Sequence, residues 1–287
     1  MTTKPTSSDR RSLVTAGAAA VVSLILAILA AAPPGSARRL AHADISSNWA
    51  GYVVTGLGST STTASGDMKY TDVTGQWVQP KATCRAGMPT SLAIWVGLGG
   101  YSLSSQELEQ VGTSSDCDEH GTPSYYIWYE LVPADPVNLK LKISPGDTIA
   151  SVVKANGTDI LVQVTDRTRG TRFTRHLSMS SSDLTSAEWI AEAPTLCNDS
   201  GFCKQLPLTR FRSFAFTRTY ATGNNAGGTI TSPGWTSTAL QLVPRTRRFF
   251  GDRNDPTASA GDAGALPSAL QPDGTGFTVT WRSSPPG

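Results

Sequence analysis

Short stretches in which apolar and polar residues alternate recur along most of the chain, joined by turns rich in Gly, Pro, Ser and Asn. A period of two sends successive side chains to opposite faces of a strand, so the pattern predicts half-buried β-strands. We expect strands at residues 45–54, 73–78, 92–98, 107–112, 124–132, 139–143, 148–155, 160–166, 172–177, 188–192, 211–220, 239–243 and 276–281. Asn156-Gly157 between two alternating stretches predicts a hairpin.

Many short strands separated by turn signals are typical of an antiparallel β-sandwich, in which two packed sheets enclose one core. No boundary divides the pattern, so we expect one domain over residues 45–287, preceded by a short linker at residues 38–44. Residues 245–272 are rich in Gly, Ala, Asp and Pro, with few large apolar side chains. We expect a long mobile loop there, before the last strand.

The first 37 residues have the pattern of an export signal. Lys4, Arg10 and Arg11 precede the apolar residues 13–32, and Gly35-Ser36-Ala37 supplies small residues for cleavage. The arginine pair also resembles a twin-arginine signal, so the predicted route is Sec or twin-arginine. An uncleaved anchor is the alternative, because the apolar run is nearly long enough to span a bilayer. Its alanine-rich composition favours cleavage, and we expect a secreted protein that is not held at a membrane.

Charge gives little indication of a partner. The chain has 24 Lys and Arg against 22 Asp and Glu, a formal net charge of +2. Residues 1–37 hold three of the basic residues and one of the acidic residues, so the two totals are equal in the remainder. A neutral balance provides no electrostatic reason to expect nucleic acid as a partner.

The chain has four cysteines, Cys84, Cys117, Cys197 and Cys203, which permit three pairings. In an exported chain, an even number favours disulfides. The short segment from Cys197 to Cys203 can close through a turn, and this leaves Cys84 to pair with Cys117. No Cys-x-x-Cys is present and the three histidines are scattered, so we expect no metal and no cofactor.

No nucleophile elbow, His-Glu-x-x-His, phosphate loop or dinucleotide fingerprint is present, which removes the commonest hydrolase and nucleotide-binding classes. The remaining candidates are strands that carry an aromatic residue beside an acid or amide. In residues 187–194, Glu188 and Glu192 lie on one face of a predicted strand. Four residues separate them by roughly 13 Å, too far to share a proton, so one of them needs a partner from elsewhere.

Six motifs, in one order, resemble the glutamic peptidases, or eqolisins, which are secreted endopeptidases built as a sandwich of two antiparallel sheets. The motifs are Ser47-Asn48-Trp49-Ala50-Gly51, Trp95-Val96-Gly97-Leu98, Glu109-Gln110-Val111-Gly112, Trp128-Tyr129-Glu130, Ser144-Pro145-Gly146-Asp147 and Ala187-Glu188-Trp189-Ile190-Ala191-Glu192. The resemblance runs from Ser47 to about Phe216, and the loop from Cys197 to Cys203 agrees with it. It implies an all-β sandwich of the jelly-roll or concanavalin-like kind.

The resemblance also implies the site. The family's catalytic glutamine falls on Gln110 and its catalytic glutamate on Glu192, and four further residues fall on positions that line the family's cleft: Trp49, Trp95, Trp128 and Glu130. Glu192 would take a proton from an attacking water and return it to the leaving amine, while Gln110 stabilises the oxyanion. We therefore expect a monomeric endopeptidase that acts on polypeptides, without a cofactor, at acidic pH.

The chain departs from the fungal members at four positions. Gly99, Ser114 and Tyr126 stand where acids are usual, and Pro194 stands where an aromatic residue follows the catalytic glutamate. These differences affect the hydrogen bonds around the catalytic pair and the side-chain preference more than the reaction. We therefore expect a bacterial-type secreted member of the family.

Two other functions remain open from the residues alone. A carbohydrate-active β-sandwich, a glycoside hydrolase, would need two carboxylates about 5–5.5 or 6.5–9.5 Å apart, for which Glu130 and Glu192 are the candidates. A non-catalytic, lectin-like binding module would leave Gln110 and Glu192 as surface groups on separate faces. Without the family pattern, Trp95 and Trp128 would be assigned to packing between sheets.

Overall fold

The computed structural model describes residues 42–57, 68–197, 200, 203–244 and 263–283, and only the backbone at Cys197 and Cys203. Every helix or strand assigned within these residues is a β-strand. No helix among them is long and apolar enough to cross a membrane. The predicted export signal at residues 1–37 lies outside the described residues, as does most of the predicted linker at residues 38–44.

The strands are β1 (Asp44–Ser46), β2 (Trp49–Gly56), β3 (Tyr70–Val78), β4 (Ala93–Gly99), β5 (Leu108–Cys117), β6 (Pro123–Val132), β7 (Val137–Leu139), β8 (Thr148–Asn156), β9 (Asp159–Asp166), β10 (Thr171–Ser178), β11 (Ser186–Glu192), β12 (Thr195–Cys197), β13 (Cys203–Gln205), β14 (Ser213–Gly223), β15 (Ala226–Gly228), β16 (Trp235–Leu242), β17 (Gly264–Pro267) and β18 (Gly276–Arg282). Every predicted strand overlaps one of them. The predicted hairpin is present between β8 and β9, where Asn156 pairs with Asp159 and Gly157 adopts φ 60°.

Two predictions need correction. The predicted strand at residues 45–54 is broken at Ser47-Asn48, so that β1 pairs with β16 in parallel and β2 pairs with β16 antiparallel. The predicted loop at residues 245–272 contains β17, which pairs with β16 and β18. This strand is short and made mostly of small residues, so it carries no alternating pattern. Residues 245–262 lie outside the described residues.

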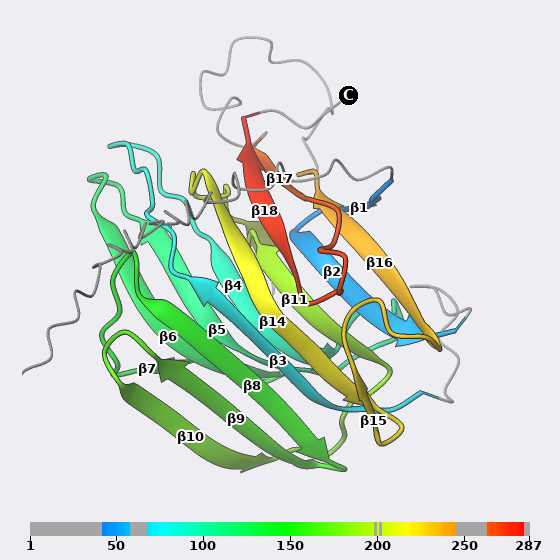
Figure 1. The fold of residues 1–287 in the computed structure, drawn as a ribbon. Helices are drawn as coiled ribbons and strands as arrows, with labels where there is room; N and C mark the ends of the chain where they lie inside the picture. The colour runs from blue at the N-terminus through cyan, green and yellow to red at the C-terminus, as the bar shows by residue number, and fades with distance from the viewer. Residues whose placement is uncertain (1–41, 58–67, 198–199, 201–202, 245–262, 284–287) are drawn as a thin grey trace, which may run out of the picture. The chain divides into compact units, whose positions relative to one another are not determined.

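One continuous path of hydrogen-bonded strands runs β10-β9-β8-β3-β14-β18-β17-β16-β2-β11-β4-β5-β6-β7, and among the described residues only β12 and β13 form a separate sheet. The sheet curls so that β3 packs on β4 and β11, while β8 packs on β4 and β5 (Figure 1). The predicted all-β, antiparallel fold is confirmed. The division into two sheets of jelly-roll type is not, because β17 and β18 join the two packed parts.

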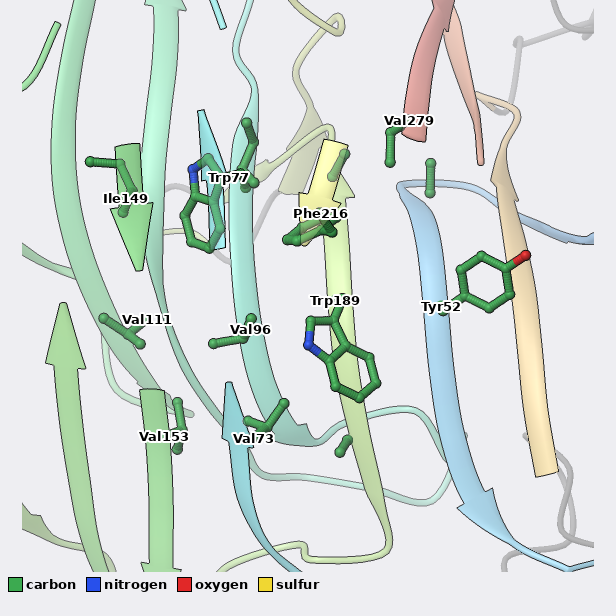
Figure 2. Close-up of a cluster of buried hydrophobic side chains, with 14 of the residues drawn as sticks. Tyr52, Val73, Trp77, Val96, Val111, Ile149, Val153, Trp189, Phe216 and Val279 are labelled. Carbon is green, nitrogen blue, oxygen red and sulfur yellow. The ribbon is translucent and has the colours of Figure 1, made fainter. Parts of the chain in front are cut away.

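The main core lies between these packed parts of the sheet. Val96, Val111 and Trp189 point into it from one side, and Val73, Trp77, Ile149, Val153 and Phe216 fill it from the other (Figure 2). The two buried indoles keep hydrogen bonds, because Trp189 Nε1 donates to the Thr74 carbonyl at 2.7 Å and Trp77 Nε1 donates to Thr113 Oγ1 at 3.0 Å. This packing fixes one face of β11, β4 and β5, so their other face is held in place for chemistry.

Candidate active site

The site residues lie on the face of β2, β11, β4, β5 and β6 that points away from the main core, which we call the site face. Strand register arranges it in three adjacent rows. The Glu192 row contains Trp49, Glu192, Ala93, Ser114 and Tyr126; the Trp95 row contains Gly51, Ile190, Trp95, Gly112 and Trp128; and the Gln110 row contains Val53, Glu188, Gly97, Gln110 and Glu130. Neighbouring rows are two residues apart along each strand, so all three point to one side.

Gln110 and Glu192 therefore share a face, whereas the lectin-like alternative needed them on separate faces. The register separates their Cα atoms by two strand spacings and four residues, roughly 16 Å. Two extended side chains narrow that gap from both ends. The carboxylate at one end and the amide at the other are thus placed to flank a substrate group lying over the Trp95 row.

The Glu192 carboxylate is held by a donor on each oxygen. Trp95 Nε1 donates to Oε2 at 2.8 Å, and Asn48 Nδ2 donates to Oε1 at 3.1 Å. The Trp95 ring is itself held edge to face against Trp49, with 5.1 Å between ring centroids. Burial raises the pKa of Glu192 above its ordinary value, and the donors Trp95, Asn48 and Trp49 lower it in part. Part of the side chain remains exposed, so water can reach it.

Gln110 is fixed by Glu130, which lies next to it in the Gln110 row. Gln110 Nε2 donates to Glu130 Oε2 at 2.6 Å, while Gln110 Oε1 has no hydrogen-bond partner among the described residues. Burial, with the Glu192 charge as the next cause, raises the pKa of Glu130 to about 7. The charges of the two carboxylates therefore repel one another across the site face. The Gln110 amide nitrogen is thus anchored, and its buried oxygen keeps an unused capacity to accept a hydrogen bond.

Trp95 and Trp128 belong both to the site face and to an apolar cluster. Both are buried in a second apolar cluster on the site face, together with Val53, Ala93, Leu108, Ile190 and Leu240, and Trp49 packs at its edge. Trp128 Nε1 has no hydrogen-bond partner among the described residues. The rings therefore pack as core residues do, while the Trp95 nitrogen binds the candidate catalytic carboxylate.

Glu188 is the other acid of the same strand, and it is fully buried. Neither of its oxygens has a hydrogen bond of normal geometry among the described residues. Burial raises its pKa far above the ordinary value, the nearby Ser186 hydroxyl opposes this in part, and the Asp183 and Glu109 charges add to the rise. Burial thus favours the neutral form of Glu188 and closes it to solvent, which favours Glu192 as the working carboxylate.

Comparison with known proteins decides the family. Residues 47–243 match the model of the peptidase A4 family, more than half of the chain. The chain belongs to the peptidase A4 family. It is 31% identical over 206 residues to aspergillopepsin-2 of Aspergillus niger, with 66% of this chain and 68% of the relative covered. The protein is therefore a glutamic endopeptidase, as the six motifs predicted, and the glycoside hydrolase alternative is set aside.

Solved structures agree on the fold of this A4 peptidase. Scytalido-glutamic peptidase with a peptide-based transition-state analogue superposes with a TM-score of 0.62 at 21% identity, covering 82% of this chain and 98% of that chain. SCP-B, an eqolisin in complex with the tripeptide Ala-Ile-His, superposes with a TM-score of 0.60 at 21% identity, with the same coverage. At this identity the likeness concerns the fold alone.

Two residues of the A4 peptidase's site face carry hydrogen bonds that sequence reasoning did not assign. Asn48 lies within one of the six motifs, but the resemblance implies no role for it, although it directly precedes Trp49, the register partner of Glu192. Asp116 accepts from Ser91 Oγ at 2.6 Å and from Tyr126 Oη at 2.7 Å. Where fungal members are expected to carry an acid, Tyr126 thus binds an acid on the neighbouring strand. Asp116 was missed because the predicted strand ended at residue 112, whereas β5 continues to Cys117.

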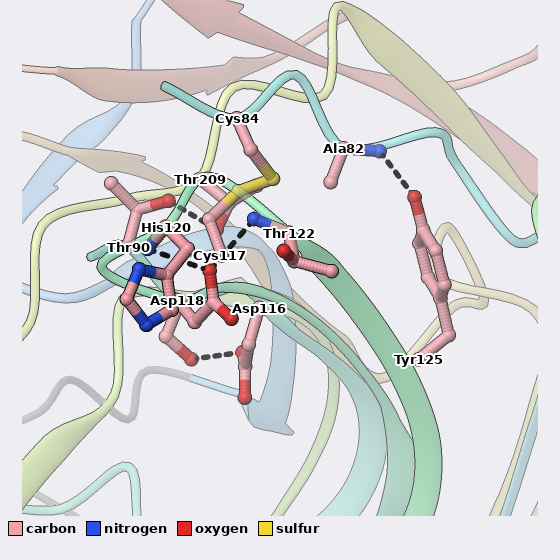
Figure 3. The surroundings of a disulfide bond; sticks show 11 residues. Ala82, Cys84, Thr90, Asp116, Cys117, Asp118, His120, Thr122, Tyr125 and Thr209 are labelled. Carbon is pink, nitrogen blue, oxygen red and sulfur yellow. Dashed lines mark hydrogen bonds between the residues drawn. A yellow bond between two sulfur atoms is a disulfide. The ribbon is translucent and has the colours of Figure 1, made fainter. Parts of the chain in front are cut away.

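A disulfide between Cys84 and Cys117 ties the end of β5 in the peptidase to the segment that precedes β4 (Figure 3). Nearby, the Ala82 backbone N–H donates to Tyr125 Oη at 3.0 Å, which attaches the same segment to β6. Cys197 and Cys203 stand opposite one another in the β12–β13 register. Their side chains lie outside the described residues, so the second predicted disulfide stays a prediction.

Neither of two hollows in the described surface coincides with the site face of this peptidase. Two shallow hollows, of about 350 and 250 Å³, are lined by other residues and include none of Gln110, Glu130 and Glu192. Within the described ranges, no group of three or more His, Cys, Asp or Glu side chains could hold a metal ion.

Proposed function

We propose that the protein hydrolyses peptide bonds in polypeptides by direct attack of water, with Glu192 as general base and then general acid and Gln110 as oxyanion stabiliser. The observation that carries this proposal is the shared face: a carboxylate held by Trp95 and an amide held by Glu130 stand on either side of one row of residues. Trp49, which is partly exposed, supplies aromatic surface for the substrate, and the buried Trp95 and Trp128 support the site from beneath.

The proton steps follow from the groups present. The Glu192 carboxylate accepts a proton from water as the water oxygen bonds to the scissile carbonyl carbon, and the carbonyl oxygen becomes an oxyanion. Gln110 Nε2 has a second N–H beside the one given to Glu130, and it donates this to the oxyanion. Its free oxygen accepts from the attacking water. Collapse breaks the C–N bond, and protonated Glu192 gives its proton to the leaving amine.

An acidic working range follows from the carboxyl environments. Because the pKa of Glu130 is raised to about 7, Glu130 is uncharged in acid and does not repel the Glu192 carboxylate. Glu188 is held protonated by the same burial effect. Activity needs ionised Glu192, whose pKa is also raised, so the rate falls at the lowest pH where that carboxylate takes up a proton.

Secretion is part of the proposal. The Cys84–Cys117 disulfide is typical of an oxidising compartment outside the cytosol, in agreement with the export pattern of residues 1–37. We infer a monomeric bacterial-type member that is released after cleavage near residue 37. Amino-terminal sequencing of the exported protein tests this, because an N-terminus upstream of the apolar residues 13–32 would contradict it.

The test of the chemistry is cleavage of an unfolded protein from pH 2 to 7 by the wild type, Gln110→Ala and the control Gln106→Ala. Gln106 is exposed and lies four residues from Gln110. We expect Gln110→Ala to lose about 10²–10³-fold in kcat, the usual loss when an oxyanion donor is removed, and Gln106→Ala to keep wild-type kcat. Undiminished cleavage by Gln110→Ala, or no cleavage by the wild type at any pH, would refute the proposal.

A further inference from the structure

The two oxygens of Glu192 are bound by residues of different kinds. Trp95, the donor to Oε2, belongs to the aromatic cluster of the site face. The donor to Oε1 is Asn48, which comes from the two-residue break between β1 and β2 and reaches a glutamate 144 residues away along the chain. The Asn48 contact thus comes from outside the aromatic cluster.

The orientation of the Asn48 amide is determined by its neighbours. Its Oδ1 accepts from Ser46 Oγ at 3.4 Å and from Ser47 Oγ at 3.5 Å. Ser46 Oγ in turn accepts from the backbone N–H of Trp49 at 3.1 Å. An ionised carboxylate can only accept hydrogen bonds, so the Asn48 nitrogen must face Glu192 and its oxygen must face the serine hydroxyls.

The backbone that carries Asn48 is held by three separate segments. The Asn48 carbonyl accepts from the Ala193 N–H at 2.9 Å, directly after Glu192. The Ser46 carbonyl accepts from the Val243 N–H at 2.8 Å, beyond the end of β16. Gln205 Nε2, at the end of β13, donates to the Ser47 carbonyl at 2.6 Å. With its backbone and its amide both fixed, Asn48 meets Glu192 in a preset geometry.

We propose that Asn48 is a positioning residue for Glu192: its amide holds Oε1 in place and stabilises the ionised carboxylate that takes the proton from water. This inference rests on the proposed role of Glu192. A hydrogen bond donated to a carboxylate favours the charged form and opposes the burial that favours the neutral form. Asn48 thereby extends the activity of the peptidase to lower pH than the buried carboxylate would otherwise allow.

Few charged groups lie near Glu192, so few of them could change its titration. On β6, the charge of Glu130 interacts with Glu192, while Tyr126 of the Glu192 row donates its hydroxyl to Asp116 of β5. The register partners of Glu192 are Trp49 on β2 and Ala93 on β4, and its second donor is the neutral Trp95 indole. Any change in the titration of Glu192 in an Asn48 variant therefore reports the lost donor, provided that Glu130 remains in place.

The test compares Asn48→Leu and Asn48→Ala with the wild type in the pH dependence of kcat on a peptide substrate. Leucine keeps the branched shape of asparagine without a donor, and alanine removes both. We expect both variants to lose about tenfold in kcat in acid, the usual cost of losing a hydrogen bond to a charged group. The acidic limb should move to higher pH by about one unit, with KM changed less than threefold.

Asn156→Ala, an exposed asparagine at the β8–β9 turn, is the control and should behave as the wild type. A packing role would leave Asn48→Leu close to the wild type and impair only Asn48→Ala. An acidic limb that stays in place in both Asn48 variants overturns the inference, whatever their melting temperatures. Glu192→Gln is assayed beside them, and full activity of this variant refutes the proposed function itself. If Glu192→Gln is inactive but the acidic limb of the Asn48 variants stays at the wild-type pH, only the positioning role is refuted.

Discussion

Glu188 and Glu192 lie on the same face of β11, four residues apart, in different surroundings. Glu192 receives indole and amide donors and keeps part of its surface exposed. Glu188 is fully buried without a hydrogen bond of normal geometry, and Glu109, on the core-facing side of β5, is equally buried and also lacks such a bond. Burial raises the pKa in both environments, but only the donors and the access to water make a carboxyl group usable as a base. The difference agrees with the proposed role of Glu192 in catalysis and with a structural role for Glu188 and Glu109.

The largest effect expected from this comparison is on stability. Burial, followed by the Asp183 and Glu107 charges, raises the pKa of Glu109 from 4.5 to about 8 in the folded protein. A raised folded pKa gives stability that is complete below the unfolded value and is lost as pH rises toward 8. Glutamine has the shape of the protonated carboxyl group and cannot ionise. Glu109→Gln should therefore gain on the order of a few kcal/mol over the wild type at pH 8 and little at pH 4.

Urea unfolding of the wild type and Glu109→Gln between pH 4 and 8 measures this difference. Glu119→Gln is the matched control, because Glu119 is exposed and should leave the pH dependence unchanged. Glu188, whose pKa is also raised, makes the free energy of unfolding fall with rising pH in the same way. The free energy of unfolding of Glu109→Gln should therefore fall less steeply with pH than that of the wild type, but should still fall. Parallel curves for the wild type and Glu109→Gln would show that Glu109 is ionised in the folded protein.

A smaller effect is expected at Glu130, which belongs to the hydrogen-bonded group of carboxyls. Glu130→Ala should lower kcat about tenfold throughout the pH range, because the Gln110 amide loses its acceptor. Glu130→Gln keeps an acceptor oxygen and should stay within about threefold of the wild type in acid. Since the pKa of Glu130 is about 7, the wild-type pH profile should change slope there and that of Glu130→Gln should not. The same slope change in both would assign it to another group.

The alternating pattern was sufficient for most strands, because strands such as β9 have one buried and one more exposed face. It did not reveal the single curled sheet, because the path closes through β17, four residues without a pattern of their own. Nor did it indicate that Glu109 points into the core, because a period of two says which residues share a face and not which face is buried. The family motifs placed Gln110, Glu130 and Glu192 on one face, but the bond from Asn48 to Glu192 joins residues that only the folded chain brings together.

The most direct test of the difference between the two acids of β11 is the kcat of Glu192→Gln and Glu188→Gln, measured side by side on an unfolded protein in acid. Both changes remove one ionisable group with little change in shape. Removal of a general base typically costs about 10²–10⁴-fold, so Glu192→Gln should fall by at least about 10²-fold. Glu188→Gln should stay within about threefold, because Glu188 is already protonated in the fold. Equal losses, or a greater loss at Glu188, would contradict the assignment of Glu192 as the base.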